Sequence, residues 1–162
     1  TIEKILNLCE LNQIASLVQN IKSHPKDATT ADGFTFSQLI FHSENLEIID
    51  SLLKLDLINP FDTDEYGYTP LHLAAKFNRF EVVCYLLEHC KANVEATTNA
   101  GQTVLLCAAT HADLKLIQYL VEQHAANIHI QLPSGTDIGA FMRNNPHPEV
   151  ITYLNERLRQ NN

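Results

Sequence analysis

Four of the five glycines in this 162-residue chain recur at one fixed interval. They are 34 residues apart each time, at Gly33, Gly67, Gly101 and Gly135. Leucine occupies the position nineteen residues after each glycine, at Leu52, Leu86, Leu120 and Leu154. A period of this length, held by several columns at once, is the signature of a protein built from stacked repeats.

Each repeat is predicted to contain a turn followed by two short helices. In the second repeat, Gly67 supplies a left-handed backbone conformation for the turn. Thr69 is suited to cap the first helix and Pro70 to begin it, and Asn78 tolerates the left-handed conformation at its end. Apolar residues at helical spacing over residues 82–87 then predict the second helix. One such pair cannot bury its apolar faces alone, so the repeats must stack.

The second repeat resembles an ankyrin repeat. Residues 64–96, DEYGYTPLHLAAKFNRFEVVCYLLEHCKANVEA, contain the family's pattern D-x-x-G-x-T-P-L-H-x-A-A, followed by V-V-x-x-L-L and A-N. Residues 101–128 match next best, with Val104 in place of the proline and Leu106 in place of the histidine. The first and fourth repeats keep the spacing but lose most of the motif. The resemblance covers about residues 31–158.

The resemblance implies an all-α fold, an ankyrin-repeat solenoid of stacked helix-turn-helix units with protruding turn or β-hairpin loops. One continuous domain is expected, with N-terminal capping helices at residues 1–30, repeats at 31–64, 65–98 and 99–132, and a C-terminal capping repeat at 133–162. Each repeat is one residue longer than the family's usual length of about 33 residues. We expect the extra residue in an extended second helix or in a bulged loop.

The composition disfavours several classes of partner. The net charge is −8 and the eleven Lys and Arg are scattered, which argues against a nucleic-acid backbone or an anionic membrane as the main partner. No apolar run approaches the length of a membrane span. Four cysteines in no regular framework indicate reduced thiols and a cytoplasmic location. Because residue 1 is not methionine, we expect a processed chain or a fragment of a longer one. We also expect the chain to be monomeric.

No group of residues in the sequence predicts catalysis or a metal site. Cys84 and His89 are five positions apart on a predicted helix and point to different sides. Cys107 falls in a column of large apolar residues, and the remaining histidines and cysteines lack the paired spacing of a zinc site. The run DTDEYG at residues 62–67 lacks calcium ligands at its fifth and twelfth positions. The resemblance gives His72 a structural role near the turn. We therefore expect no enzyme activity, no cofactor and no metal.

The resemblance also implies where a partner binds. Ankyrin repeats use the turn tips and the exposed side of the first helices, which line a concave groove, while the second helices form the convex back. Carried onto this sequence, these columns predict a partner-binding set of Phe34, His42, Glu65, Tyr66, Tyr68, Lys76, Phe77, Asn99, Gln102, Thr110 and His111. The same columns add Ala31, Asp32, Ser43 and Ala100, and in the fourth repeat Pro133, Ser134, Thr136, Asn144 and Asn145.

Four aromatic residues in these columns are expected to be exposed to solvent: Phe34, Tyr66, Tyr68 and Phe77. Exposed aromatic side chains in a concave patch are typical of binding hot spots. The alternative for Phe34 and Phe77 is that the ring packs over the neighbouring repeat.

Three functional hypotheses follow. The first is a non-enzymatic module that binds one protein partner, with a basic or apolar contact surface, in the groove. The second is the substrate-recognition or targeting part of a larger enzyme, or of an effector that an intracellular bacterium delivers into the host cytosol. The third, an enzyme within these residues, would require a polar cleft with convergent reactive groups, and the sequence offers no motif for one.

Overall fold

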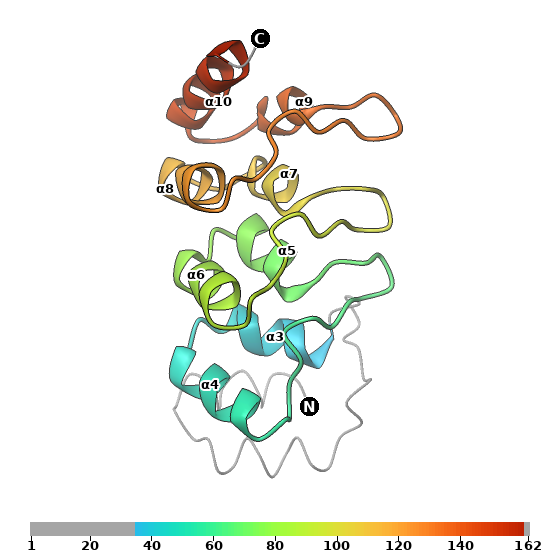
Figure 1. Cartoon of the computed structure of the whole chain (residues 1–162), viewed down its shortest axis with the longest axis vertical. Coiled ribbons are helices and arrows are strands. Elements are labelled where there is room, and N and C mark those ends of the chain that lie inside the picture. Colours follow the sequence, from blue (N-terminus) through green and yellow to red (C-terminus); the bar gives the residue numbers. More distant parts are fainter. Residues whose placement is uncertain (1–34, 161–162) are drawn as a thin grey trace.

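The computed structural model describes residues 35–160, which form a stack of four helix pairs (Figure 1). The predicted capping helices at residues 1–30 and the predicted contact residues Ala31, Asp32 and Phe34 lie outside the described residues. The pairs are α3 (Phe36–His42) with α4 (Leu46–Lys54), α5 (Pro70–Lys76) with α6 (Phe80–Glu88), α7 (Val104–Ala108) with α8 (Leu114–Gln118), and α9 (Ile138–Met142) with α10 (Pro148–Gln160).

The first helices of the pairs form one layer and the second helices form another. The loops between repeats project from the side of the first helices (Figure 1). The described residues contain helices and isolated bridges but no strand, so the predicted all-α solenoid of stacked pairs is confirmed. Among residues 35–160, no helix has the length and apolarity needed to cross a membrane.

Each first helix begins at a side chain that caps it. The capping residue is Thr35, Thr69, Thr103 or Asp137, and its side-chain oxygen accepts a hydrogen bond from the backbone N–H three residues later. This contact satisfies one of the N–H groups that a helix leaves without a partner at its first turn. The caps therefore start the four first helices at the same position of every period.

Three projecting loops, which we call the fingers, consist of residues 59–69, 93–103 and 127–137. Two of them close through an isolated antiparallel bridge, Thr97 with Thr103 and Gln131 with Asp137. In the first finger Gly67 has a φ of +81°, and a Cβ there would lie 2.6 Å from Oδ1 of Asn99. Only glycine fits, because it provides both the left-handed conformation and room for the next finger.

The core is a continuous apolar cluster between the two helix layers. The leucines of the period, Leu52, Leu86, Leu120 and Leu154, are all fully buried, as the sequence predicts. Ala74 and Ala75 are buried on α5, where their small side chains let adjacent first helices approach closely. The apolar columns thus form the seam along which repeats stack.

His72 joins the start of α5 to the following finger. Its Nδ1 lies 2.8 Å from Oγ1 of Thr69, and its Nε2 lies 3.0 Å from the carbonyl oxygen of Ala96 and 3.2 Å from that of Gln102. The side chain is fully buried, and burial lowers the pKa of its imidazole, so it is neutral at pH 7. The structural role that the resemblance gives to His72 is confirmed.

Gln38 takes the place of this histidine in the first repeat. Its Oε1 accepts from the Thr35 N–H at 2.8 Å, and its Nε2 donates to the carbonyl oxygen of Tyr68 at 2.6 Å. An amide side chain offers one acceptor and one donor group, as a neutral imidazole does. The first repeat therefore keeps the link between helix and finger although it lacks the family's histidine.

The extra residue of each period is accommodated in two ways. In the second repeat the Cys90 N–H donates to the carbonyl oxygen of Tyr85, five residues back, at 3.3 Å. In the third repeat the same place is a π-helical turn, η1 (Tyr119–Gln123), which follows α8 directly. A single π-type turn inserts one residue into a helix. The second helix of the third repeat, α8 with η1, is therefore extended, as predicted, and the second repeat makes the same type of hydrogen bond directly after α6.

The first repeat places its extra residue in the loop instead. The left-handed residue that ends the second helix is Asp56, with a φ of +53°, whereas the corresponding residues of the next two repeats are Lys91 and Ala125. Asp56 comes one position earlier in the period, so the connection to the first finger is one residue longer. Both predicted locations of the extra residue thus occur in one chain.

A column of tyrosines links the second helices to one another. Tyr85, Tyr119 and Tyr153 are 34 residues apart, and each donates its hydroxyl to a carboxylate of the preceding repeat. The acceptors are Asp50 at 3.1 Å, Glu88 at 2.7 Å and Glu122 at 2.9 Å. Burial and the neighbouring Asp50 carboxylate raise the pKa of Tyr85 to about 12.

Candidate protein-binding surface

The fingers project on the side of the first helices α3, α5, α7 and α9, and we call this side of the stack the finger face (Figure 1). The capped helix starts and the paired fingers fix its shape. Asn99 pairs the first two fingers, because its N–H donates to the carbonyl oxygen of Tyr66 at 2.9 Å and its Nδ2 to that of Glu65 at 2.9 Å. The finger face is therefore held by backbone hydrogen bonds rather than by mobile side chains alone.

A hollow of about 390 Å³ lies between the first two fingers. We call it the tyrosine hollow, and its lining residues are Tyr66, Tyr68, Thr98, Asn99, Ala100 and Gln102. Five of the six lie in the predicted contact columns, and they come from two successive repeats. Thr98 is the residue that the columns miss. Residues from the predicted columns therefore meet in this hollow, and their contact with a partner stays a prediction.

Tyr68 is less exposed than the sequence predicts. Its hydroxyl donates to Oε1 of Gln102 at 2.8 Å, and its ring edge meets His72 with 6.0 Å between ring centroids. The side chain is half-buried, and burial raises the pKa of its hydroxyl. The expectation of a freely exposed Tyr68 is wrong, because the next finger supplies a hydrogen-bond partner. Tyr66, by contrast, is 61% exposed.

A second group of predicted residues meets beside the tyrosine hollow. Phe77 is 43% exposed and its ring lies edge-on to His42 of the preceding repeat, with 5.1 Å between centroids. The ammonium of Lys76 lies 5.6 Å from the ring centroid of Tyr68 and 6.0 Å from that of Phe77. Both expectations for Phe77 hold in part, because one edge packs on the neighbouring repeat while the rest of the ring faces solvent.

Another hollow, of about 440 Å³, lies further along the finger face, between the third and fourth repeats. We call it the threonine hollow, and it is lined by Thr110, His111, Thr136, Ala140, Phe141 and Asn144. Four of these residues lie in the predicted columns. Phe141 was missed because its column is filled by buried residues in the preceding repeats, such as Leu73 and Cys107.

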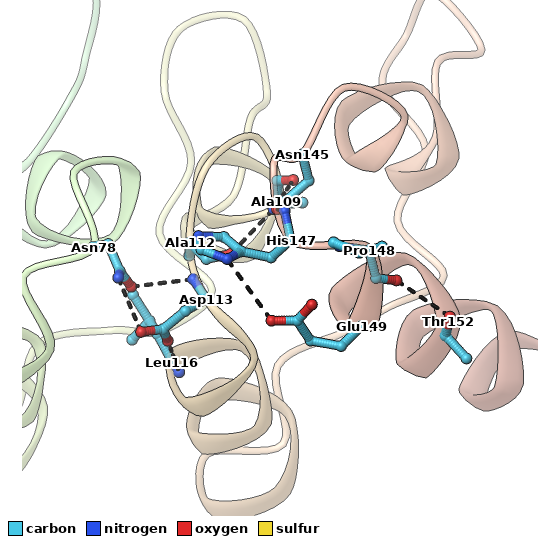
Figure 2. Close-up of polar contacts among 10 residues, drawn as sticks. All are labelled: Asn78, Ala109, Ala112, Asp113, Leu116, Asn145, His147, Pro148, Glu149 and Thr152. Atoms are coloured by element: carbon cyan, nitrogen blue, oxygen red, sulfur yellow. Dashed lines mark hydrogen bonds and ion pairs between the residues drawn. The ribbon is translucent and has the colours of Figure 1, made fainter.

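Asn145 is not part of this surface, although its column predicts a contact residue. Its side chain is buried, and Nδ2 donates to the carbonyl oxygens of Ala109 at 2.9 Å and Ala112 at 3.1 Å (Figure 2). Its Oδ1 accepts from the N–H of His147 at 2.8 Å. The prediction is wrong because the side chain turns toward the preceding repeat, where both carbonyl groups lie in the connection between α7 and α8.

The cysteine and histidine side chains that the sequence analysis considered for catalysis pack against neighbouring residues in the structure. Cys107 is buried in the core, as predicted, and burial raises the pKa of its thiol to about 12. Burial also raises the pKa of Cys84, while His89 stacks on Tyr85 with 5.0 Å between centroids. Within residues 35–160, His, Cys, Asp and Glu side chains nowhere gather in a group that could hold a metal ion.

Comparison with family models identifies the repeats. A model described as ankyrin repeats in three copies matches residues 6–98, and a model of ankyrin repeats in many copies matches residues 78–121. The chain belongs to the ankyrin-repeat family. The first match begins within the range for which capping helices were predicted. No curated protein matches the chain. Ankyrin repeats are protein–protein interaction modules, and the finger face is the surface of this ankyrin-repeat chain on which the predicted contact columns converge.

Proposed function

We propose that this ankyrin-repeat chain is a non-enzymatic module that binds a protein partner on its finger face. The observation that carries the proposal is the pair of hollows on that face. Each is lined by side chains from two successive repeats, so each exists only in the stacked protein. The same face serves if the module recognises a substrate on behalf of a longer protein.

The exposed aromatic residues support the same surface. Tyr66 and Phe77 are two of the four large hydrophobic side chains that the described residues leave exposed, and both lie on the finger face. Aromatic rings that stay exposed on a rigid surface are enriched among the residues that dominate binding energy. Leu55, another of the four, is 54% exposed and follows α4 in the other layer.

A capture experiment with matched variants tests this proposal. The wild-type chain, Tyr66→Ala/Phe77→Ala and Leu55→Ala are immobilised, circular dichroism checks that all are folded, and captured proteins are quantified by mass spectrometry. We expect at least one protein that wild type and Leu55→Ala retain and that the double variant loses by more than about tenfold, because truncating each hot-spot aromatic costs about 2 kcal/mol. Equal capture by all three proteins would contradict the proposal.

A further inference from the structure

The fingers carry negative charge, and no basic side chain among residues 35–160 forms an ion pair with their carboxylates. Residues 59–69, 93–103 and 127–137 contain no Lys or Arg, and their carboxylates are Asp62, Asp64, Glu65, Glu95 and Asp137. In the described part of the chain, the ion pairs of Lys and Arg all lie away from these three loops. The finger carboxylates instead accept hydrogen bonds from neutral donors, such as the Ser37 hydroxyl on Asp62 at 2.6 Å and the Tyr68 N–H on Asp64 at 2.9 Å.

The first finger combines this charge with an open aromatic ring. Asp64 and Glu65 directly precede Tyr66, whose ring is exposed at the rim of the tyrosine hollow. Asp64 also lies beside the hollow, because its Oδ1 accepts a hydrogen bond from the Tyr68 N–H at 2.9 Å, and its negative charge contributes to the raised pKa of the Tyr68 hydroxyl. The lining of the hollow itself is neutral, so its potential depends on the nearby charged groups, which are Asp64 and Glu65 beside Tyr66 and Lys76 over Tyr68.

The two tyrosine rings differ in what covers them. Lys76 already lies over Tyr68, and its charge stands at the end of the hollow nearest α5. Among the described residues, no cation or aromatic ring lies over Tyr66. A tyrosine face beside carboxylates attracts a cation through the ring quadrupole and through charge. A second cation is therefore favoured at the Tyr66 end, beside Glu65.

We propose that the tyrosine hollow binds an arginine or lysine side chain on a polypeptide segment of the protein partner. The cationic group lies against the exposed ring of Tyr66, within the field of Asp64 and Glu65. The proposal rests on the function proposed above and adds the chemistry of the segment that is recognised.

Selection from a displayed library of random short peptides tests the charge of the ligand. The library is panned on the full wild-type chain. Enriched peptides are synthesised and titrated against Tyr66→Ala, Glu65→Lys and Glu156→Lys, and also against Phe77→Ala and His111→Ala. Glu156 is an exposed residue of α10, so its variant is a control with the same change of charge. We expect enrichment of Arg and Lys over the starting library. Affinity should fall at least about tenfold for Tyr66→Ala and about fivefold for Glu65→Lys, and should be unchanged for Glu156→Lys.

The contrary outcomes separate this inference from the proposed function. Peptides that require Tyr66 but show no enrichment in basic residues would overturn the cationic ligand and leave the finger face as the binding surface. Peptides that require Phe77 or His111 but not Tyr66 would contradict binding in the tyrosine hollow and would leave the finger face as the binding surface. If no enriched peptide depends on any of these residues, the proposed function fails as well.

Discussion

At the scale of single residues, Asn144 and Asn145 show how one position along the chain changes what a side chain does. Asn144 is exposed and lines the threonine hollow, whereas Asn145 is buried and donates to two carbonyl groups in the connection between α7 and α8 of the preceding repeat. Sequence reasoning places both in contact columns, because the repeat period fixes backbone position and not side-chain direction. The structure separates a surface residue from a structural one.

Asn145→Ala should destabilise the fold while Asn144→Ala should not. The first change leaves two buried carbonyl groups without a donor, which costs about 1–3 kcal/mol. The second removes an exposed side chain and should change the free energy of unfolding by less than about 0.5 kcal/mol. Urea unfolding followed by circular dichroism measures both. Equal stability of the two variants would contradict the role given to Asn145.

His72 is the buried polar residue on which acid stability should depend. Its pKa is lowered by burial in the folded state, so the unfolded chain takes up the proton more readily. The stability that neutral His72 contributes is therefore fully present above its unfolded pKa of about 6.5 and is lost as the pH falls below that value. Leu106 occupies the corresponding position of the third repeat and is fully buried, so leucine can be accommodated there.

His72→Leu should be less stable than wild type at neutral pH and should lose less stability in acid. We expect a deficit of about 1–3 kcal/mol near neutrality, since the carbonyl groups of Ala96 and Gln102 lose their donor. The deficit should narrow between about pH 7 and about pH 5, because only the wild type has a buried imidazole to protonate at this position. The pKa of His42 is also lowered, but His42 is present in both proteins, so its effect on the free energy of unfolding cancels in the comparison. A deficit that stays constant over this range would contradict the assignment.

At the scale of elements, the tyrosine column and the caps set the register between repeats. The second helices of the second, third and fourth repeats each donate one tyrosine hydroxyl to the preceding second helix, and the acceptor follows local sequence rather than a fixed spacing. Tyr119 and Tyr153 reach glutamates 31 residues back, whereas Tyr85 reaches Asp50, 35 residues back. Lys54 stands where the next repeat has Glu88, and it pairs with Asp50. The 34-residue spacing of the tyrosines can be read from the sequence, but the carboxylates that accept their hydrogen bonds can be identified only in the packed structure.

Tyr119→Phe tests one link of this column. The change keeps the ring, which packs edge-on to Phe80 with 5.3 Å between centroids, and removes only the hydroxyl bound to Glu88. We expect the free energy of unfolding to fall by about 0.5–1.5 kcal/mol, the usual contribution of one hydrogen bond. Tyr66→Phe is the matched control, since this exposed ring lies on the finger face and should leave stability unchanged. No loss in Tyr119→Phe would show that the column does not stabilise the stack.

At the scale of the whole molecule, one apolar cluster runs through all four helix pairs. Each repeat contacts its neighbours, so the fold depends on a seam rather than on a central core. This apolar seam is the feature of the fold that the sequence predicts best. Columns repeated every 34 residues identify the buried leucines, the capping threonines and the turn glycines without any long-range information.

The parts that could not be predicted depend on contacts between repeats. The partner of the Tyr68 hydroxyl is in the next finger, and the carbonyl groups that bind Asn145 are in the preceding repeat. Gln38 replaces the motif histidine in the first repeat, yet it links the helix start to the Tyr68 carbonyl group as His72 links it to that of Gln102, because the geometry requires a donor and an acceptor rather than an imidazole. A column of the repeat predicts where a residue lies along the backbone, but it does not predict which residue of a neighbouring repeat its side chain bonds to.

The most direct test of the account is to ask which face of the stack touches the partner. A photoreactive benzophenone side chain is introduced singly at Tyr66, Phe77 and His111 on the finger face, and at Leu55 and Glu156 in the layer of second helices. Each variant is irradiated in an extract of the source cells, and cross-linked adducts are resolved by electrophoresis and mass spectrometry. The account predicts one common partner from the finger-face positions and none from the other two. A partner cross-linked only from Leu55 or Glu156 would contradict it.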